Sequence, residues 1–325
     1  MLDLGTPLIE ISDHEFESAF STDDLDSGDL VQSEAPIYAE SLEQMVMLVW
    51  DHINKPTFRL SNSSISELLK SPLDFFKYIG RRFTHPDKLP KISDAMLLGM
   101  AIDSYVFRKL VSNTWEYLPQ DKPMNRTTKE GKAAYAELQA EAAANGKKVL
   151  PLAVWEKVQI MGKAFEVNEI LRGWCLEWAN RIQYKVSGKI DGFDIVGVID
   201  AMGSSQHSPQ LRAARGSWYL CDLKSMPSAD DRYLKYEIPK RGLHLQQWIY
   251  NKLLHQQLGV EVDTNLVAVL TATGHANVKR LTADQLQEAA RMFRKAISVF
   301  EAILTSNRPE SLLLSYVHKD GFSYL

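Results

Sequence analysis

The stretch WYLCDLKS, residues 218–225, sets two aromatic residues and a short apolar run directly before Asp222 and Lys224. Its composition predicts a buried strand, yet the strand ends in an acid and a base two positions apart. Side chains two apart on a strand share a face, so we expect Asp222 and Lys224 to point the same way while Leu223 turns into the core. Such a pair indicates either a simple ion pair or a reactive site.

Two further strands are predicted before this stretch. RIQYKVSG, residues 181–188, alternates in polarity, and FDIVGVIDAM, residues 193–202, follows an Asp-Gly pair that is typical of a two-residue hairpin turn. Residues 203–216 are polar and predict a loop that leads into the third strand. Three consecutive strands predict an antiparallel meander, in which Asp200 of the second strand comes close to Asp222 of the third.

Apolar residues recur at helical spacing on both sides of the meander. Ser64 with Glu67 and Thr282 with Gln285 have the spacing of capping boxes, and Pro72 is expected to end one helix and begin the next. Helices are predicted over residues 41–54, 59–80, 94–110, 126–146, 151–173, 243–259 and 281–304, and a further strand over residues 265–274.

The order of these elements is helices, then three strands, then helix–strand–helix, which is typical of a mixed α/β fold with a helical N-terminal part. We expect a single domain over residues 41–325, with a helical part over 41–175 and a sheet core over 176–325. Residues 1–40 are acidic, rich in Ser and Asp and without periodicity, which predicts a flexible arm.

Charge is distributed unevenly along the chain. Residues 1–44 hold 12 of the 41 acidic residues and none of the 37 basic residues, so the remaining 281 residues carry 29 acids and 37 bases. A basic body suits a protein that binds a phosphate backbone, although ordinary solvated charge explains it equally well. The acidic arm is either a solubilising tail or a segment that mimics DNA or docks a partner.

Several functional classes lack support in the sequence. Cys175 and Cys221 are the only cysteines, too few for a four-thiolate zinc or iron–sulfur site, and this favours a reducing, cytoplasmic setting without a disulfide framework. No apolar run reaches the roughly 18 residues of a membrane span, and the acidic N-terminus does not predict a secretory signal. The motifs of serine hydrolases, P-loop NTPases and zinc proteases do not occur.

The two carboxylates of the meander indicate a chemistry. Asp200 and Asp222 would repel each other at close range unless a cation lies between them. Ligation by oxygen favours Mg2+ or Mn2+ over zinc, and a neighbouring lysine such as Lys224 can orient water and stabilise charge on a phosphate. The pattern predicts metal-dependent hydrolysis of a phosphodiester, although a surface ion pair is the commoner explanation of an isolated Asp-x-Lys.

Two features outside the meander support a site. Gln246 and Tyr250 are four residues apart in a predicted helix, so they share a face that can look back at the strands. Asp103 ends the apolar segment GMAID, residues 99–103, where a buried and unpaired acid is costly and requires a cation or solvent. Each feature alone also occurs in ordinary core helices.

In this order the segments resemble the PD-(D/E)XK nuclease superfamily, and in particular its RecE-like branch, which includes the C-terminal nuclease domain of exodeoxyribonuclease VIII and its phage relatives. The resemblance covers roughly residues 59–260 and rests on RLSNSSISELLKSP, LLGMAIDSYVF, RTTKEGKAAYAELQAEAAANGKKVL, GVIDAM, CDLKSMPSA and GLHLQQWIY. It implies a restriction-endonuclease-like core, in which a mixed central sheet is flanked by helices.

The resemblance also implies roles for individual residues. By position, Asp200 and Asp222 would hold Mg2+ or Mn2+, and the main-chain carbonyl of Leu223 would be a further ligand. Lys224 would be the catalytic lysine. Asp103 stands where many relatives have a metal-binding histidine, and an aspartate is a competent oxygen ligand for the same ions.

The supporting residues follow from the same likeness. Gln246 and Tyr250 match the glutamine and tyrosine that support the site and the DNA in the family. Asp191 is an alternative to Asp200, because both follow a glycine by three residues. Asp191 is expected in the hairpin turn and Asp200 at the end of a strand, and this favours Asp200.

The function implied by the resemblance is that of a Mg2+- or Mn2+-dependent exonuclease that acts on the ends of double-stranded DNA in recombination or DNA processing. Its setting would be the cytoplasm, or the host cytoplasm for a phage-encoded protein. DNA is the expected partner, together with a single-strand annealing protein and further copies of the same chain. Alternatives are a structure-specific endonuclease of the same fold and a catalytically silent relative that binds DNA or protein.

Overall fold

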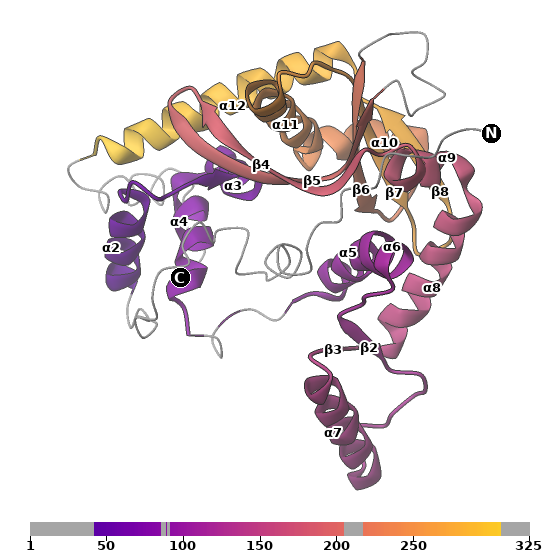
Figure 1. Cartoon of the computed structure of the whole chain (residues 1–325). Helices are drawn as coiled ribbons and strands as arrows, with labels where there is room; N and C mark the ends of the chain where they lie inside the picture. The colour runs from indigo at the N-terminus through magenta and orange to yellow at the C-terminus, as the bar shows by residue number, and fades with distance from the viewer. Residues whose placement is uncertain (1–41, 86–88, 90–91, 205–216, 307–325) are drawn as a thin grey trace.

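The computed structural model describes residues 42–85, 89, 92–204 and 217–306, so the predicted arm over residues 1–40 lies outside the described residues. A mixed six-stranded sheet with helices on both faces forms the centre (Figure 1), which confirms the predicted mixed α/β class. The strand order is β1-β5-β6-β7-β8, and β4 pairs with the other edge of β5. The strands are β1 (Leu60–Ser61), β4 (Arg181–Ile190), β5 (Phe193–Ser204), β6 (Trp218–Ser225), β7 (Val262–Leu270) and β8 (Ala276–Arg280).

β4 and β5 form a long antiparallel hairpin, as the Asp-Gly pair predicts. Asp191 and Gly192 form its turn with φ angles of 50° and 89°, in the left-handed region that the tightest hairpin turns require. Pairing of the two strands extends from Ile190 and Phe193 beside the turn as far as Arg181 and Met202, which are the predicted outer limits of the two strands. The hairpin leaves the other edge of β5 available to β1 and β6.

β6 joins the hairpin to the rest of the sheet and spans the predicted residues Trp218–Ser225. It pairs antiparallel with the end of β5 and parallel with β7. The connection between β6 and β7 runs through α10 (Asp231–Lys240) and α11 (Leu243–Leu258). The prediction for the following strand is wrong at its end, because β7 stops at Leu270 and the chain turns back into β8.

One face of the sheet is covered by helices from both ends of the described chain. α3 (Asn62–Lys70) and α4 (Pro72–Gly80) pack there with α11 and α12 (Ala283–Leu304), and α2 (Leu42–Ile53) extends the layer. Their shared core includes the buried aromatic residues Phe75, Phe76, Phe293 and Phe300. Burial of each such side chain contributes about 1.5–3 kcal/mol. The helices before the sheet and the helix after it therefore belong to one core.

The opposite face carries α5 (Asp94–Ser104), α8 (Leu152–Val167) and α9 (Glu169–Arg172) around a second core, and the short α6 (Leu110–Ser112) contributes no residue to it. The predicted helix over 94–110 is interrupted by a π turn, Tyr105–Lys109. The predicted helix over 151–173 breaks at Asn168, whose side chain caps α9, and a second π turn, Gly173–Glu177, follows.

The start of α3 differs from the prediction. Ser61 rather than Ser64 is the N-cap, since its side chain accepts from the backbone N–H of Ser64 at 3.2 Å while Ser64 Oγ accepts from the N–H of Ser61 at 2.8 Å. Glu67 forms an ion pair of 2.7 Å with Lys70 instead. The break at Pro72 and the capping box at the start of α12 are confirmed.

α7 (Lys129–Ala144) stands apart from the layers (Figure 1), on a two-stranded parallel sheet of β2 (Tyr117–Pro119) and β3 (Lys148–Leu150). Ala142 is the one buried residue of this helix. Its Ala-rich sequence has a high intrinsic helix propensity, which accounts for a helix with little packing. Across the part of the chain that the structure describes, no helix has the length and apolar content to cross a bilayer.

Candidate active site

β5 and β6 separate within the sheet and create a fork. Their pairing ends at Ala201 and Cys221. Beyond this position β6 continues beside β7, whereas the same edge of β5 pairs next with β1. Asp200 and Asp222 are the first residues past the last pair, one on each branch, so the fork brings the two predicted carboxylates together.

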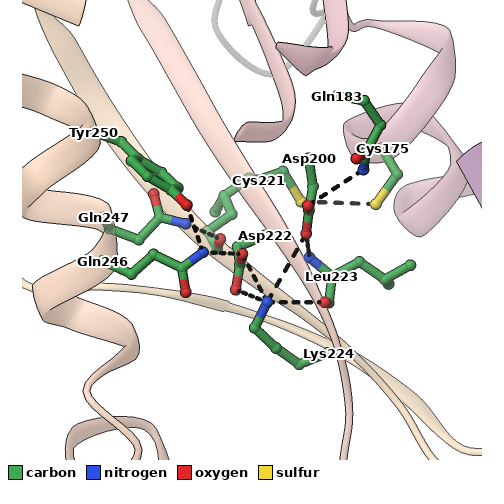
Figure 2. Close-up of polar contacts among 11 residues, drawn as sticks. Cys175, Gln183, Asp200, Cys221, Asp222, Leu223, Lys224, Gln246, Gln247 and Tyr250 are labelled. Atoms are coloured by element: carbon green, nitrogen blue, oxygen red, sulfur yellow. Dashed lines mark hydrogen bonds and ion pairs between the residues drawn. The ribbon is translucent and has the colours of Figure 1, made fainter. Parts of the chain in front are cut away.

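Asp200 bridges the two branches of the fork. Its Oδ2 accepts a hydrogen bond of 2.8 Å from the backbone N–H of Leu223 (Figure 2), in place of a strand-to-strand bond. The N–H and C=O of one strand residue point to the same side, so the Leu223 carbonyl also faces the fork. Lys224 Nζ donates to this oxygen at 3.3 Å. The fork therefore holds a main-chain oxygen beside two carboxylates.

The pleat of β5 changes at Asp200. Ile199 packs in the core beneath α11 and α12 and Ala201 in the core beneath α5 and α8, although residues two apart share a face in a regular strand. Gln183 stands opposite on β4 with a φ of 48°, which is uncommon for a residue other than Gly. Its amide donates to Asp200 Oδ1 at 3.4 Å. Polarity patterns gave no sign of this contact.

Asp222 and Lys224 lie on one face of β6, and Leu223 between them is buried in the core. Lys224 Nζ lies 2.8 Å from the carboxylate of Asp222 and 4.0 Å from Oδ2 of Asp200. The Asp222 side chain is 3% exposed and that of Lys224 30%. The site is therefore open to solvent on the lysine side.

α11 holds Asp222 in place. Gln246 Nε2 donates to Asp222 Oδ1 at 2.9 Å and to the hydroxyl of Tyr250 at 3.1 Å, so both predicted helix residues lie at the site (Figure 2). Gly197 of β5 makes room for the tyrosine, since a Cβ at this position would lie 2.3 Å from Cε1 of the Tyr250 ring. The ring therefore packs directly on the backbone of the strand that carries Asp200.

The charged side chains alter one another's protonation. Burial, and then repulsion from Asp222, raises the pKa of Asp200 well above its ordinary value. Burial alone would lower the pKa of Lys224, but the charges of Asp222 and Asp200 outweigh it and raise that pKa. Burial and the same two acids raise the pKa of Tyr250, so its hydroxyl keeps its proton. The single positive charge of Lys224 does not balance the negative charges that the acids of the site can carry. This favours the binding of a further cation.

Asp103 of α5 approaches the site from the face opposite α11. α5 passes close to the end of β6, since a Cβ added to Gly99 would lie 3.5 Å from Oγ of Ser225. Burial raises the pKa of Asp103 to about 7, with Lys224 lowering it and Asp222 raising it. Within residues 42–85, 89, 92–204 and 217–306, no three His, Cys, Asp or Glu side chains are grouped as a metal site. A ligand role for Asp103 stays a prediction.

Asp191, the alternative to Asp200, lies at the far end of the hairpin. It is exposed in the turn, whereas Asp200 contacts both Gln183 and Leu223 inside the fork. The structure therefore brings Asp200, and not Asp191, to Asp222.

The donor atoms of the fork fit a hard divalent cation. Asp200, Asp222 and the Leu223 carbonyl offer oxygen alone, the donor that Mg2+ and Mn2+ prefer. Asp222 Oδ2 is buried, and apart from the Lys224 ammonium at 2.8 Å it receives no aligned hydrogen bond. Mg2+ is commonly held by one or two carboxylates together with waters and substrate phosphates. These three residues are therefore suited to hold Mg2+ or Mn2+.

No family model and no curated protein matches this chain. Among solved structures it is similar to one named "Putative exonuclease", from Eubacterium rectale, with a TM-score of 0.49 and 15% identity over 84% of this chain and 88% of that chain. It is also similar to the protein SSO0001, with a TM-score of 0.26 and 13% identity over 74% of this chain and 86% of that chain. Both TM-scores and both identities are low, so neither similarity assigns a function.

Proposed function

We propose that this chain is a divalent-metal-dependent deoxyribonuclease that hydrolyses phosphodiester bonds at the ends of double-stranded DNA. The observation that carries the proposal is the fork, where Asp200, Asp222 and the Leu223 carbonyl meet beside Lys224. The ordered resemblance to RecE-like nucleases supports the substrate. The excess of basic residues after residue 44 suits a phosphate backbone.

A bound Mg2+ or Mn2+ supplies Lewis-acid stabilisation of the charge that builds on the phosphate. Asp200, Asp222 and the Leu223 carbonyl would hold the ion. Gln246 fixes the orientation of Asp222 through the 2.9 Å hydrogen bond, and Tyr250 in turn contacts Gln246. Loss of such outer contacts typically lowers metal affinity or activity by about 10–100-fold.

Lys224 acts through charge and orientation. Because the two aspartates raise its pKa, the ammonium stays protonated at neutral pH. From its position between the acids it donates hydrogen bonds that orient a water molecule for attack and stabilise phosphate oxygens.

The resemblance alone supports the wider setting of the proposal. We place the activity in recombination or DNA processing in the cytoplasm, of the host if the protein is phage-encoded. A single-strand annealing protein and further copies of the chain are the proposed protein partners.

The test is degradation of linear duplex DNA labelled at one end, with the full chain in Mg2+, Mn2+ or EDTA. We expect nucleotides to be released with either metal but not with EDTA, and closed circular duplex to stay intact. Lys224→Ala should lower the rate by about 100-fold or more, as loss of a group that stabilises transition-state charge does. Lys189→Ala is the matched control, because it removes a 2.9 Å ion pair with Asp194 on the surface.

Each outcome separates the alternatives. A wild-type protein that releases no nucleotides with either metal contradicts the nuclease proposal and favours a silent DNA- or protein-binding relative. Cleavage of the closed circle favours a structure-specific endonuclease. Equal degradation by the wild type and by Lys224→Ala shows that the activity does not come from this fork.

A further inference from the structure

The two cysteines of the chain lie together beside the fork. Cys175 and Cys221 are 46 residues apart in sequence, yet their Sγ atoms are 3.7 Å apart (Figure 2). Both are buried and free. The chain of 325 residues has no other cysteine, so composition alone does not explain this contact.

Cys221 occupies the position that fixes the spacing of the fork. It pairs with Ala201 at the last contact between β5 and β6. The next residue on β6 is Asp222, and the residue before Ala201 on β5 is Asp200. A displacement of the Cys221 backbone is therefore expected to alter the distance between the two proposed metal ligands.

Cys175 belongs to the π turn Gly173–Glu177, which packs in the same core as Cys221, on the face of the sheet that carries α5 and α8. The Tyr219 hydroxyl donates to the Trp174 carbonyl of this turn at 3.0 Å, so the turn and β6 are also joined two residues before Cys221. The thiol pair thus connects an outer helical turn to the strand that carries the site.

We propose that Cys175 and Cys221 form an oxidation-sensitive dithiol, and that its conversion to a disulfide weakens the metal site. The oxidant is hydrogen peroxide. One sulfur attacks a peroxide oxygen and becomes a sulfenic acid, and the other peroxide oxygen leaves as water with the thiol proton. The second sulfur then displaces the sulfenic hydroxyl, which leaves as water with the second thiol proton. Two thiols and one peroxide give one disulfide and two waters.

Closing the bond requires a local movement. A disulfide bond measures about 2.05 Å, so sulfurs now 3.7 Å apart must approach by roughly 1.7 Å. We expect part of this movement to fall on β6 at Cys221. Mg2+ requires near-ideal ligand distances, and productive sites tolerate displacements of only about 0.5 Å. The disulfide is therefore expected to lower metal affinity.

The reaction is expected to be slow. Both thiols are buried, and burial in apolar surroundings disfavours the thiolate, which is the reactive form of cysteine. Burial also excludes bulky reagents, so a small oxidant such as hydrogen peroxide should react where a large disulfide reagent does not.

The experiment follows the full chain through prolonged treatment with hydrogen peroxide. Mass spectrometry of the chain and its peptides should show loss of two hydrogen atoms and a cross-link between the two cysteines. Calorimetric titration with Mn2+ should show affinity lowered by about tenfold or more, with recovery after dithiothreitol. Cys175→Ser, with Cys175→Ala as a second variant, should form no cross-link and keep its affinity. These variants also control for oxidation of the 10 methionines.

Two results would overturn the inference: no cross-link after prolonged peroxide treatment, or a cross-link that leaves Mn2+ affinity unchanged. The effect on the site rests on the proposed function, but the cross-link does not. A reduced protein that binds no Mn2+ counts against the proposed function, and the mass measurement still decides whether the dithiol closes.

Discussion

At the scale of single residues, the site depends on small departures from regular β-structure. Gln183 adopts a left-handed conformation opposite Asp200, and the faces of β5 change there. Asp200 then replaces a strand-to-strand hydrogen bond by accepting from the N–H of Leu223. The carboxylates meet where the backbone of two strands would otherwise pair.

Gly197 is expected to control the site without contacting a ligand. In Gly197→Ala the new Cβ would collide with the Tyr250 ring, which is buried and has little freedom to move. The ring would shift and the contacts from Tyr250 through Gln246 to Asp222 would weaken, so we expect Mn2+ affinity or hydrolysis to fall by about 10–100-fold. Calorimetry and the DNA assay measure the two effects.

Gly188→Ala provides the control for this change. Gly188 lies in the same hairpin, but its added Cβ would meet the end of the Gln256 side chain at 2.6 Å and Cδ2 of Leu253 at 3.2 Å, neither of which belongs to the fork. If Gly197→Ala and Gly188→Ala bind Mn2+ equally well, the positioning role of Gly197 is wrong.

At the scale of elements, the sequence predicts what strong patterns determine. The alternation of polarity and the Asp-Gly turn identify the β4–β5 hairpin. The apolar run at residues 218–225 gives the limits of β6. β8 and α10 were not predicted. β8 is a polar edge strand without buried residues, and α10 turns only Leu234 and Ile238 inward, so neither has a clear periodicity.

The candidate site likewise has parts that local sequence patterns predict and parts that they do not. The shared face of Asp222 and Lys224 and the helical spacing of Gln246 and Tyr250 follow from local periodicity. The fork does not, because the position where β5 leaves β6 depends on pairing with β1, which comes from a distant part of the chain. The conformation of Gln183 is equally a result of tertiary packing.

The strand-to-helix turn at Ser61 gives a prediction at this scale. Ser61→Ala removes the N-cap of α3 and leaves the N–H of Ser64 without its acceptor, so we expect the free energy of unfolding to fall by about 0.5–2 kcal/mol. Glu67→Ala removes an ion pair with Lys70, whose side chain is exposed, and this pair is expected to be worth about 0.2–0.5 kcal/mol. Urea unfolding measures the free-energy change of each variant. A larger loss for Glu67→Ala than for Ser61→Ala would favour the capping box of Ser64 and Glu67 that the sequence predicts.

At the scale of the whole molecule, charge separates the ends of the chain from its body. Every Asp, Glu, Lys or Arg among the first 44 residues is an acid, whereas the remainder of the chain has more basic than acidic residues. Within the described residues, Asp200 and Asp222 lie in the fork, which is exposed to solvent on the side of Lys224. An acidic segment and a phosphate backbone would compete for the same basic surface.

Deletion of residues 1–40 is therefore expected to tighten binding of duplex DNA at low salt, because negative charge that competes with the phosphates is removed. The difference should shrink as salt screens it. Fluorescence anisotropy with a labelled duplex across a salt series measures this. A full-length variant with the arm acids changed to Asn or Gln should bind like the deletion, whereas unchanged affinity and salt slope in both proteins would identify a plain tail.

Asp200 and Asp222 are proposed to hold a divalent ion together, and calorimetric titration with Mn2+ tests this. We expect the wild type to bind Mn2+, Asp200→Asn and Asp222→Asn each to lose about tenfold or more in affinity, and Asp194→Asn, which lies in a surface ion pair, to match the wild type. Wild-type affinity in Asp200→Asn and Asp222→Asn, or no Mn2+ binding by the wild type, would show that the two carboxylates do not hold the ion.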